Sequence, residues 1–306
     1  MPRQIGLLRA SLEYVALAPL WLPLRYLPLA QAVKLGGALG PLAMALDRRN
    51  RPIAERNLTI AFPNSGDDAR LAILRETYCN FGRMAAEWAH LFEITPTSFD
   101  RFGRFDGYEN WNEALHAADG RGLLILTAHV GNFEILIMVP ATRGDRLALV
   151  HRPNRNPLFD RMVTARRERF RAITVPRKGA GRPALKLLHD NWTVAMPLDL
   201  DSRSGVFVDF FGIPAATSDG LARVAMATGA PVLPAFILRD GIGPRHVVKI
   251  LPAIEIVRTR DREDSIRENT QRFTAAIESV VRDHPSQWNW IHRRWKTRPP
   301  GEPRFY

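Results

Sequence analysis

From about residue 121 onward, short apolar runs alternate with amphipathic stretches, and this alternation constrains the fold more than any other feature of the chain. The runs have the length of strands, and the stretches between them repeat apolar residues at helical spacing. Strands and helices alternating at such intervals indicate an α/β fold with a mixed, largely parallel sheet flanked by helices. The predicted strands are 123–126, 147–150, 194–198, 232–237 and 247–251, and the predicted helices are 157–171, 182–190, 219–228 and 265–282.

Composition narrows the class of protein and of partner. A chain of 306 residues with 46% hydrophobic and 24% charged residues can build a large core, which excludes disordered and coiled-coil classes. Its single cysteine, Cys79, cannot form an intramolecular disulfide, so we expect a reducing compartment. The 43 Lys and Arg residues outnumber 31 Asp and Glu, a formal net charge of +12. That excess predicts an anionic partner: nucleic acid, a membrane surface, a phosphorylated substrate or an acidic protein.

The N-terminal region is apolar. Residues 14–33 carry one charge, Arg25, and are close to the roughly 20 apolar residues that a membrane span needs, although three prolines interrupt them. We predict that residues 1–46 are a membrane-attachment region, interfacial or marginally spanning, and that one domain covers 47–306. The basic residues at 48–51 would then meet anionic lipid on the cytoplasmic side. A helical hairpin buried in a soluble core is the alternative.

The strongest candidate for chemistry is the segment 127–134, which directly follows a predicted strand. Reactive groups in α/β folds lie at this end of the strands. Gly131 permits a tight turn, and Glu134 falls in the first turn of the next helix. A carboxylate that holds a histidine leaves the other ring nitrogen free to take a proton, and no nucleophile-elbow motif is present. We predict that His129 and Glu134 act as a general base on a substrate hydroxyl. A capping glutamate beside a structural histidine is the alternative.

Further polar residues follow neighbouring predicted strands. Arg152 ends one strand, and its guanidinium could bind a phosphate through two parallel hydrogen bonds or polarise a carbonyl group. Asp199 and Asp201 end another, and either could pair with Arg152. These three residues are therefore predicted to bind substrate at the same edge of the sheet as His129.

Two other functions fit the sequence less well. Nucleic-acid binding would explain the net charge and the basic cluster at 166–171, but the basic residues are scattered and no base-reading motif occurs, so we interpret the cluster as a solvated helix face. A metal hydrolase would use His129, Glu134, Asp199 and Asp201 as ligands. Zinc sites usually need more closely spaced His or Cys residues, so we predict no metal.

Together these elements resemble the late acyltransferases of lipid A biosynthesis, the lauroyl and myristoyl family. The family has a histidine and an acidic residue separated by four positions, where the wider glycerolipid acyltransferases usually have aspartate as the acid. It also has a proline-aspartate-x-aspartate element, into which this chain inserts Leu198. The matching residues are His129 with Glu134, His151-Arg152-Pro153, Pro197 with Asp199 and Asp201, and the ending Trp290 to Pro299.

The resemblance implies a single acyltransferase catalytic domain over 47–306 with a glycerolipid-acyltransferase-like fold. It implies transfer of a fatty acyl chain from acyl carrier protein to a hydroxyl of a lipid A precursor, without a cofactor, at the cytoplasmic face of the inner membrane. An acidic carrier protein, a phosphorylated acceptor and an anionic membrane all suit the net charge of +12. Another lipid acceptor (a glycerolipid, aminolipid or glycosylated lipid) is the alternative, because a shared fold constrains the acceptor poorly.

Overall fold

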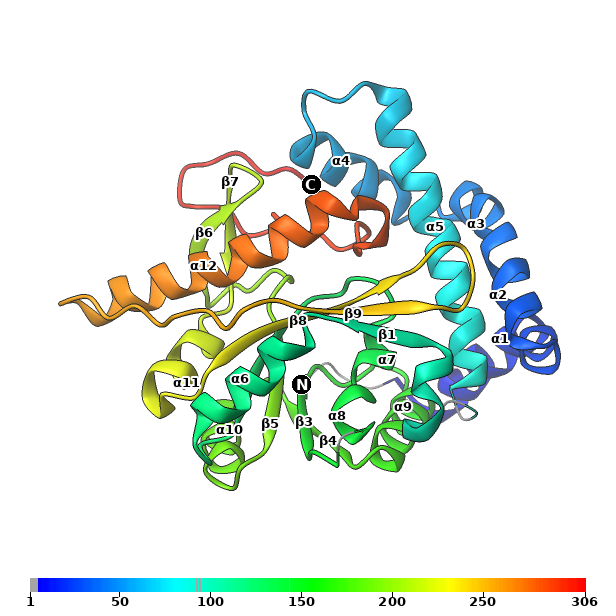
Figure 1. The fold of residues 1–306 in the computed structure, drawn as a ribbon. Coiled ribbons are helices and arrows are strands. Elements are labelled where there is room, and N and C mark those ends of the chain that lie inside the picture. Colours follow the sequence, from blue (N-terminus) through cyan, green and yellow to red (C-terminus); the bar gives the residue numbers. More distant parts are fainter. Residues whose placement is uncertain (1–4, 92, 94, 143) are drawn as a thin grey trace.

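A seven-stranded sheet runs through the centre of the computed structural model, which describes residues 5–306 except 92, 94 and 143 (Figure 1). Its strand order is β1-β9-β8-β2-β5-β3-β4, and every neighbouring pair is parallel except β8 with β9. This arrangement confirms the predicted mixed, largely parallel sheet. The strands are β1 (Gly103–Asp106), β2 (Leu123–Thr127), β3 (Leu147–His151), β4 (Ala172–Pro176), β5 (Thr193–Pro197), β8 (Val232–Arg239) and β9 (His246–Ile250).

The predicted strands all exist within two residues of their expected ends, and the strands that were not predicted lie at the margins. β2 and β8 are buried along their whole length, which explains their continuous apolar sequence. β1 and β4 are the two edge strands; β1 alternates between half-buried and exposed residues, and β4 is buried only at Ala172 and Val175. A separate antiparallel hairpin, β6 (Val206–Phe210) with β7 (Ile213–Thr217), was also not predicted.

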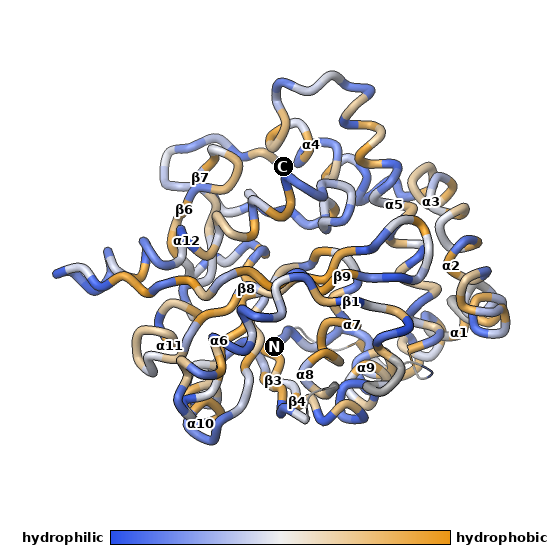
Figure 2. The backbone as a smooth tube through the Cα atoms, in the orientation of Figure 1, coloured by the Kyte–Doolittle hydropathy of each residue, from blue (hydrophilic) through white to orange (hydrophobic). Residues whose placement is uncertain are grey.

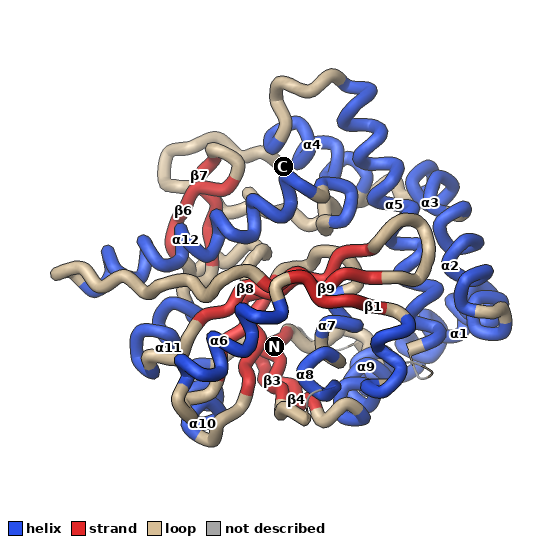
Figure 3. The backbone as a smooth tube through the Cα atoms, in the orientation of Figure 1, coloured by secondary structure: helices blue, strands red, loops and turns tan. Residues whose placement is uncertain are grey.

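Helices cover both faces of the sheet, as Figure 3 shows. Successive side chains of a strand point to opposite faces, so each strand contributes to two cores. Leu124 and Leu126 of β2 join the core against the helices of one face, whereas Leu123 and Ile125 join the core against the other. The strands are accordingly the hydrophobic centre of the molecule in Figure 2. The helices of the first face are α10 (Gly181–His189), α11 (Gly220–Thr228) and α12 (Arg262–Asp283), and those of the second are α6 (Tyr108–Ala118), α7 (Phe133–Leu136), α8 (Val139–Thr142) and α9 (Pro157–Arg169).

Four helices precede the long helix α5 (Asp67–His90). The first three lie along its outer side at the right of Figure 1, and the fourth lies at the top, beside the C-terminal end of the chain. The four helices are α1 (Leu7–Tyr26), α2 (Leu29–Ala38), α3 (Gly40–Leu46) and α4 (Arg51–Ala61). Gly36 of α2 meets Gly82 of α5 so closely that a Cβ added to Gly82 would lie 1.9 Å from the Gly36 carbonyl oxygen. Only glycine fits this contact, so α2 is packed directly against the rest of the chain.

The expected interruption of the N-terminal segment by prolines is only partly correct. α1 continues through Pro19 and Pro23, and the break falls at Pro28, which caps α2. Among the described residues, one stretch is long and apolar enough to cross a membrane by length and composition alone; it is Leu29–Leu46, later than the predicted 14–33, and 28% of it is buried. The outer faces of these helices expose large apolar side chains: Leu7, Leu8, Leu12, Val15, Leu22, Tyr26, Leu35, Leu42 and Leu46.

Candidate active site

The loop 128–132 joins the end of β2 to α7 and carries His129. Gly131 has a φ of 55°, and a Cβ there would lie 2.1 Å from the Ile237 carbonyl oxygen, so this turn requires glycine. The C-terminal segment holds the loop from outside, because the Gly131 N–H donates to the Gln287 carbonyl (2.9 Å) and the Asn289 N–H donates to the His129 carbonyl (3.2 Å). The loop is therefore fixed at His129 and at the turn that follows it.

His129 is held by Asp199. The imidazole Nδ1 donates to Oδ1 of Asp199 at 2.8 Å, and Oδ2 of Asp199 accepts from the His129 backbone N–H and from Trp288 Nε1, both at 2.9 Å. Asp199 is 1% exposed, whereas the His129 side chain is 21% exposed. Because a carboxylate can only accept here, Nδ1 carries a proton, and in the neutral imidazole Nε2 therefore keeps its lone pair. Nε2 makes no hydrogen bond with any residue that the structure describes.

The two groups shift each other's titration. Burial alone would raise the pKa of Asp199, but the charge of His129 and the hydrogen bonds from His129 and Trp288 outweigh it and lower that pKa to about 2. Burial likewise opposes protonation of His129, but the Asp199 carboxylate outweighs it and raises the pKa of the imidazole. Asp199 therefore stays ionised and stabilises an imidazolium.

The predicted partnership of His129 with Glu134 is wrong. The Glu134 carboxylate faces Arg167 of α9 instead, with Oε1–Nη2 at 2.5 Å and Oε2–Nε at 3.1 Å, and both side chains are buried. The reason lies in the sheet. β2 pairs with β5 so that Thr127 lies opposite Pro197, which places His129 and Asp199 each two residues beyond the paired ends. Glu134 is nearer in sequence but starts a helix that turns its side chain elsewhere.

Arg167 was not expected in the site. The basic cluster at 166–171 is not a solvated helix face throughout, because Arg166 and Arg167 are 6% and 7% exposed. Arg167 lines a cavity, and its Nη1 is buried without a hydrogen-bond partner in the described chain. An unpaired buried donor costs roughly 1–3 kcal/mol, so a ligand oxygen at this position would be stabilising.

A cavity of about 530 Å³ opens beside these groups. Its polar part is lined by His129, Glu134, Arg152, Asp201 and Arg167, so four of the five predicted site residues meet there, and Asp199 lies buried behind His129. Asp201 does not pair with Arg152, because its carboxylate accepts from the backbone N–H and hydroxyl of Thr297. The cavity then continues between the sheet and α6–α8, where its walls are apolar: Trp88, Trp111, Ile125, Ile137, Leu147 and Leu149.

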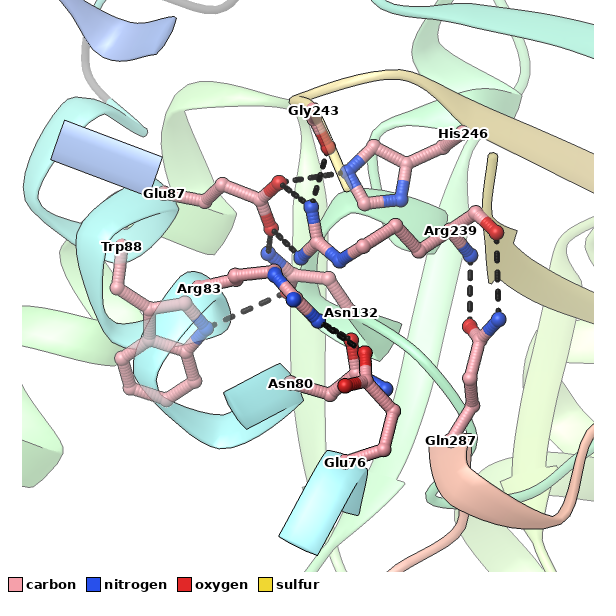
Figure 4. Close-up of polar contacts among 10 residues, drawn as sticks. All are labelled: Glu76, Asn80, Arg83, Glu87, Trp88, Asn132, Arg239, Gly243, His246 and Gln287. Carbon is pink, nitrogen blue, oxygen red and sulfur yellow. Dashed lines mark hydrogen bonds and ion pairs between the residues drawn. The ribbon is translucent and has the colours of Figure 1, made fainter. Parts of the chain in front are cut away.

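A second buried cluster fixes the other end of the loop (Figure 4). Glu87 of α5 accepts two hydrogen bonds from Arg239 (2.6 and 2.7 Å), one from His246 Nε2 (3.0 Å) and one from Asn132 (2.8 Å). Asn132 lies three residues after His129, so this cluster ties the loop to α5 and to the hairpin β8–β9. We call Glu87, Arg239, His246 and Asn132 the Glu87 cluster.

The Glu87 carboxylate is ionised like that of Asp199. Burial would raise its pKa, but His246 and Arg239 outweigh it and lower the pKa to about 2. No sequence pattern pointed to this cluster, because its members come from three distant segments. Across the ranges that the structure describes, no group of three or more His, Cys, Asp or Glu side chains could hold a metal ion.

Comparison with known proteins gives consistent matches over nearly the whole chain. A family model described as bacterial lipid A biosynthesis acyltransferase matches residues 5–297. The lipid A biosynthesis lauroyltransferase of Escherichia coli (strain K12) is 28% identical over 97% of this chain and 95% of its own length. The lipid A biosynthesis acyltransferase of Haemophilus influenzae is 26% identical over 91% of this chain and 86% of its own length.

One solved structure is also similar, the 1-acyl-sn-glycerophosphate acyltransferase PlsC from Thermotoga maritima. It is 15% identical with a TM-score of 0.37, and the match covers 84% of this chain and 99% of that one.

Proposed function

The chain belongs to the bacterial lipid A biosynthesis acyltransferase family, and from this premise we propose that it transfers a fatty acyl chain from acyl carrier protein to a hydroxyl of a lipid A precursor. The observation that carries the proposal is the state of His129. One ring nitrogen is locked to a buried, ionised carboxylate, and the other is free beside a cavity. This is the arrangement of a general base.

In the proposed reaction, the acceptor hydroxyl gives its proton to Nε2 of His129 while its oxygen attacks the carbonyl carbon of the thioester. The C–O bond forms, and the C–S bond breaks when the tetrahedral intermediate collapses. The departing thiolate of the carrier protein takes the proton back from the imidazolium. Asp199 stabilises the imidazolium in between, and its buried position keeps the ring oriented.

Arg167 supplies the positive charge for the intermediate. Arg167 lines the cavity, its Nη1 is a donor without a partner among the described residues, and Glu134 holds the rest of the guanidinium in place through two hydrogen bonds. A donor already in place where negative charge develops costs no reorganisation during the reaction. Glu134 is therefore a positioning residue in this proposal, acting through Arg167 and not through His129.

The apolar end of the cavity suits the acyl chain. Its walls are aromatic and aliphatic side chains from α6, α8 and the sheet, and it begins beside His129. A chain seated there would place its thioester carbonyl near the polar part of the cavity. Burying an acyl chain out of water stabilises the complex by about 0.8 kcal/mol per methylene.

We propose that the enzyme works at the cytoplasmic face of the inner membrane. The exposed leucines of α1 give it an apolar surface, and an acceptor that stays in the bilayer avoids the cost of extraction. Replacing Leu8 and Leu12 by serine should reduce the fraction of protein that sediments with membranes. The exposed Leu71 on α5 provides the matched control, Leu71→Ser. Equal sedimentation of both variants and the parent would contradict attachment through α1.

Mass spectrometry of the reaction product tests the function directly. The purified protein is given acyl carrier protein thioesters and thioesters without a carrier protein, which bear acyl chains of different length. A lipid A precursor, a lysophospholipid, an aminolipid and a glycosylated lipid are the competing acceptors. The proposal predicts an acyl ester on the lipid A precursor. Exclusive acylation of any other acceptor would reject the lipid A assignment, and acylation from a non-carrier thioester alone would reject the donor.

A further inference from the structure

Two arginines lie side by side at the mouth of the cavity. β3 pairs with β4 so that His151 lies opposite Pro176, and the next residue of each strand is an arginine, Arg152 and Arg177. The Arg177 backbone N–H donates to the His151 carbonyl at 2.8 Å, which extends the pairing up to these residues. Both side chains line the cavity.

Neither guanidinium has a partner among the residues that the structure describes. In the described part of the chain, the side chains of Arg152 and Arg177 form no hydrogen bond or ion pair, while the other charged groups of the cavity are all engaged. Burial lowers the pKa of Arg177, and the adjacent charge of Arg152 lowers it further, against the opposing effect of Asp201. Two like charges held together at a cavity mouth are stabilised by an anion that binds both.

The backbone beside them is open to such an anion. Gly179 and Gly181 also line the cavity, and a Cβ added to either would meet no atom within 4 Å. Gly181 starts α10, whose first turn carries no acidic residue, so the positive end of the helix is not neutralised. A phosphate group carries enough charge and enough acceptor oxygens for two arginines and a helix N-terminus together.

We propose that Arg152 and Arg177 form a phosphate clamp that positions a phosphorylated substrate at the cavity mouth. The proposal rests on the function proposed above, and two sources share this chemistry. One is a phosphate on the lipid acceptor, and the other is the phosphodiester of the pantetheine arm that bears the acyl group on the carrier protein. Bidentate contact from each guanidinium fixes the phosphate's orientation as well as its distance from His129.

The first experiment requires no catalysis, so it separates failure of the clamp from failure of the proposed function. Full-length protein is labelled with phenylglyoxal, an arginine reagent, in inorganic phosphate or in chloride of equal ionic strength, and the labelled residues are quantified by mass spectrometry. Phosphate should slow labelling of Arg152 and Arg177 several-fold. Arg182 is the internal control, because it is exposed one residue beyond the cavity lining. If each of the three arginines is labelled as fast in phosphate as in chloride, the clamp is rejected.

The second experiment identifies the source of the phosphate. Arg177→Gln should raise the KM of the phosphorylated partner by about tenfold or more, the value of one hydrogen bond to a charged group, with a smaller change in kcat. An effect that disappears with a dephosphorylated acceptor assigns the clamp to the acceptor. An effect that disappears with a pantetheine thioester lacking phosphate assigns it to the donor. If Arg177→Gln behaves like Arg182→Gln with all of these substrates, the clamp is rejected.

Discussion

Two buried carboxylates hold the two ends of the loop 128–132. They differ in whether a hydrogen-bonding partner keeps a free nitrogen atom beside the cavity. Asp199 and Glu87 are each 1% exposed, and charged partners lower the pKa of each to about 2. The partner of Asp199 is a histidine whose second nitrogen is free beside the cavity. Glu87 is enclosed by Arg239, His246 and Asn132, none of which lines the cavity (Figure 4).

This difference shows that a perturbed pKa does not by itself identify a catalytic group. A lowered pKa would mark both carboxylates as candidates for a catalytic role. Only Asp199, however, is bonded to a side chain that lines the cavity. At the Asp199 site, His129 lines the cavity and can exchange a proton with a substrate. In the Glu87 cluster, the carboxylate and its partners are away from the cavity, so their charges stabilise the fold. Variants at the two sites should therefore separate activity from stability.

The largest effect on turnover is expected for His129→Ala. This change removes the proposed general base, so the turnover number should fall by about 10²- to 10⁴-fold. The free energy of unfolding should also fall, by roughly 1–3 kcal/mol, because the buried Asp199 carboxylate loses one hydrogen-bond partner while it keeps the His129 N–H and Trp288. Steady-state assays with a carrier protein thioester, paired with urea unfolding, measure both quantities. A variant that keeps near-parental turnover would show that His129 is not the base.

A smaller loss is expected for Asp199→Asn, which keeps a hydrogen-bonding group but removes the charge. Losing one charged hydrogen bond should lower turnover by about 10- to 100-fold. The Asp199 carboxylate raises the pKa of His129, so its neutralisation should move the acidic limb of the pH–rate profile to lower pH. Glu134→Gln is the matched control, since Glu134 contacts Arg167 and not the imidazole. A larger shift of that limb in Glu134→Gln than in Asp199→Asn would restore the original pairing of His129 with Glu134.

The smallest effect on turnover per folded molecule is expected for Glu87→Gln, whose main effect should be on stability. It leaves Arg239 buried without its counter-charge, which should lower the free energy of unfolding by roughly 3–5 kcal/mol. The folded pKa of about 2 lies below the ordinary value of 4.5, so the ionised carboxylate contributes fully above pH 4.5 and progressively less as pH falls toward 2. Urea unfolding of the parent and Glu87→Gln should therefore converge at low pH. A constant difference across that range would contradict this account.

The sequence predicted the elements that are buried throughout and the residues that follow them. The apolar runs of β2 and β5 placed His129 and Asp199 correctly at one edge of the sheet. Their partnership was not predictable, because it depends on the register between strands 70 residues apart, whereas Glu134 was the nearest carboxylate along the chain. Arg167 was missed because an arginine in an amphipathic helix ordinarily faces solvent. Arg177 was missed because its strand, β4, is a half-exposed edge without an apolar run.

In the proposed membrane-bound state, the contact of Gly36 with Gly82 would govern how the membrane presents substrate to the site. A catalytic domain on a flexible tether samples many heights and tilts above a bilayer, and its encounter with lipid follows an effective concentration set by tether length. Here α2, which packs against the leucine-bearing helix α1, lies on α5 backbone against backbone, without room for a side chain between Gly36 and Gly82. The packing of these helices then fixes the distance and the angle between the lipid surface and the cavity mouth. Lengthening the chain between α1 and α5 would not change them, whereas a single methyl group at position 82 would.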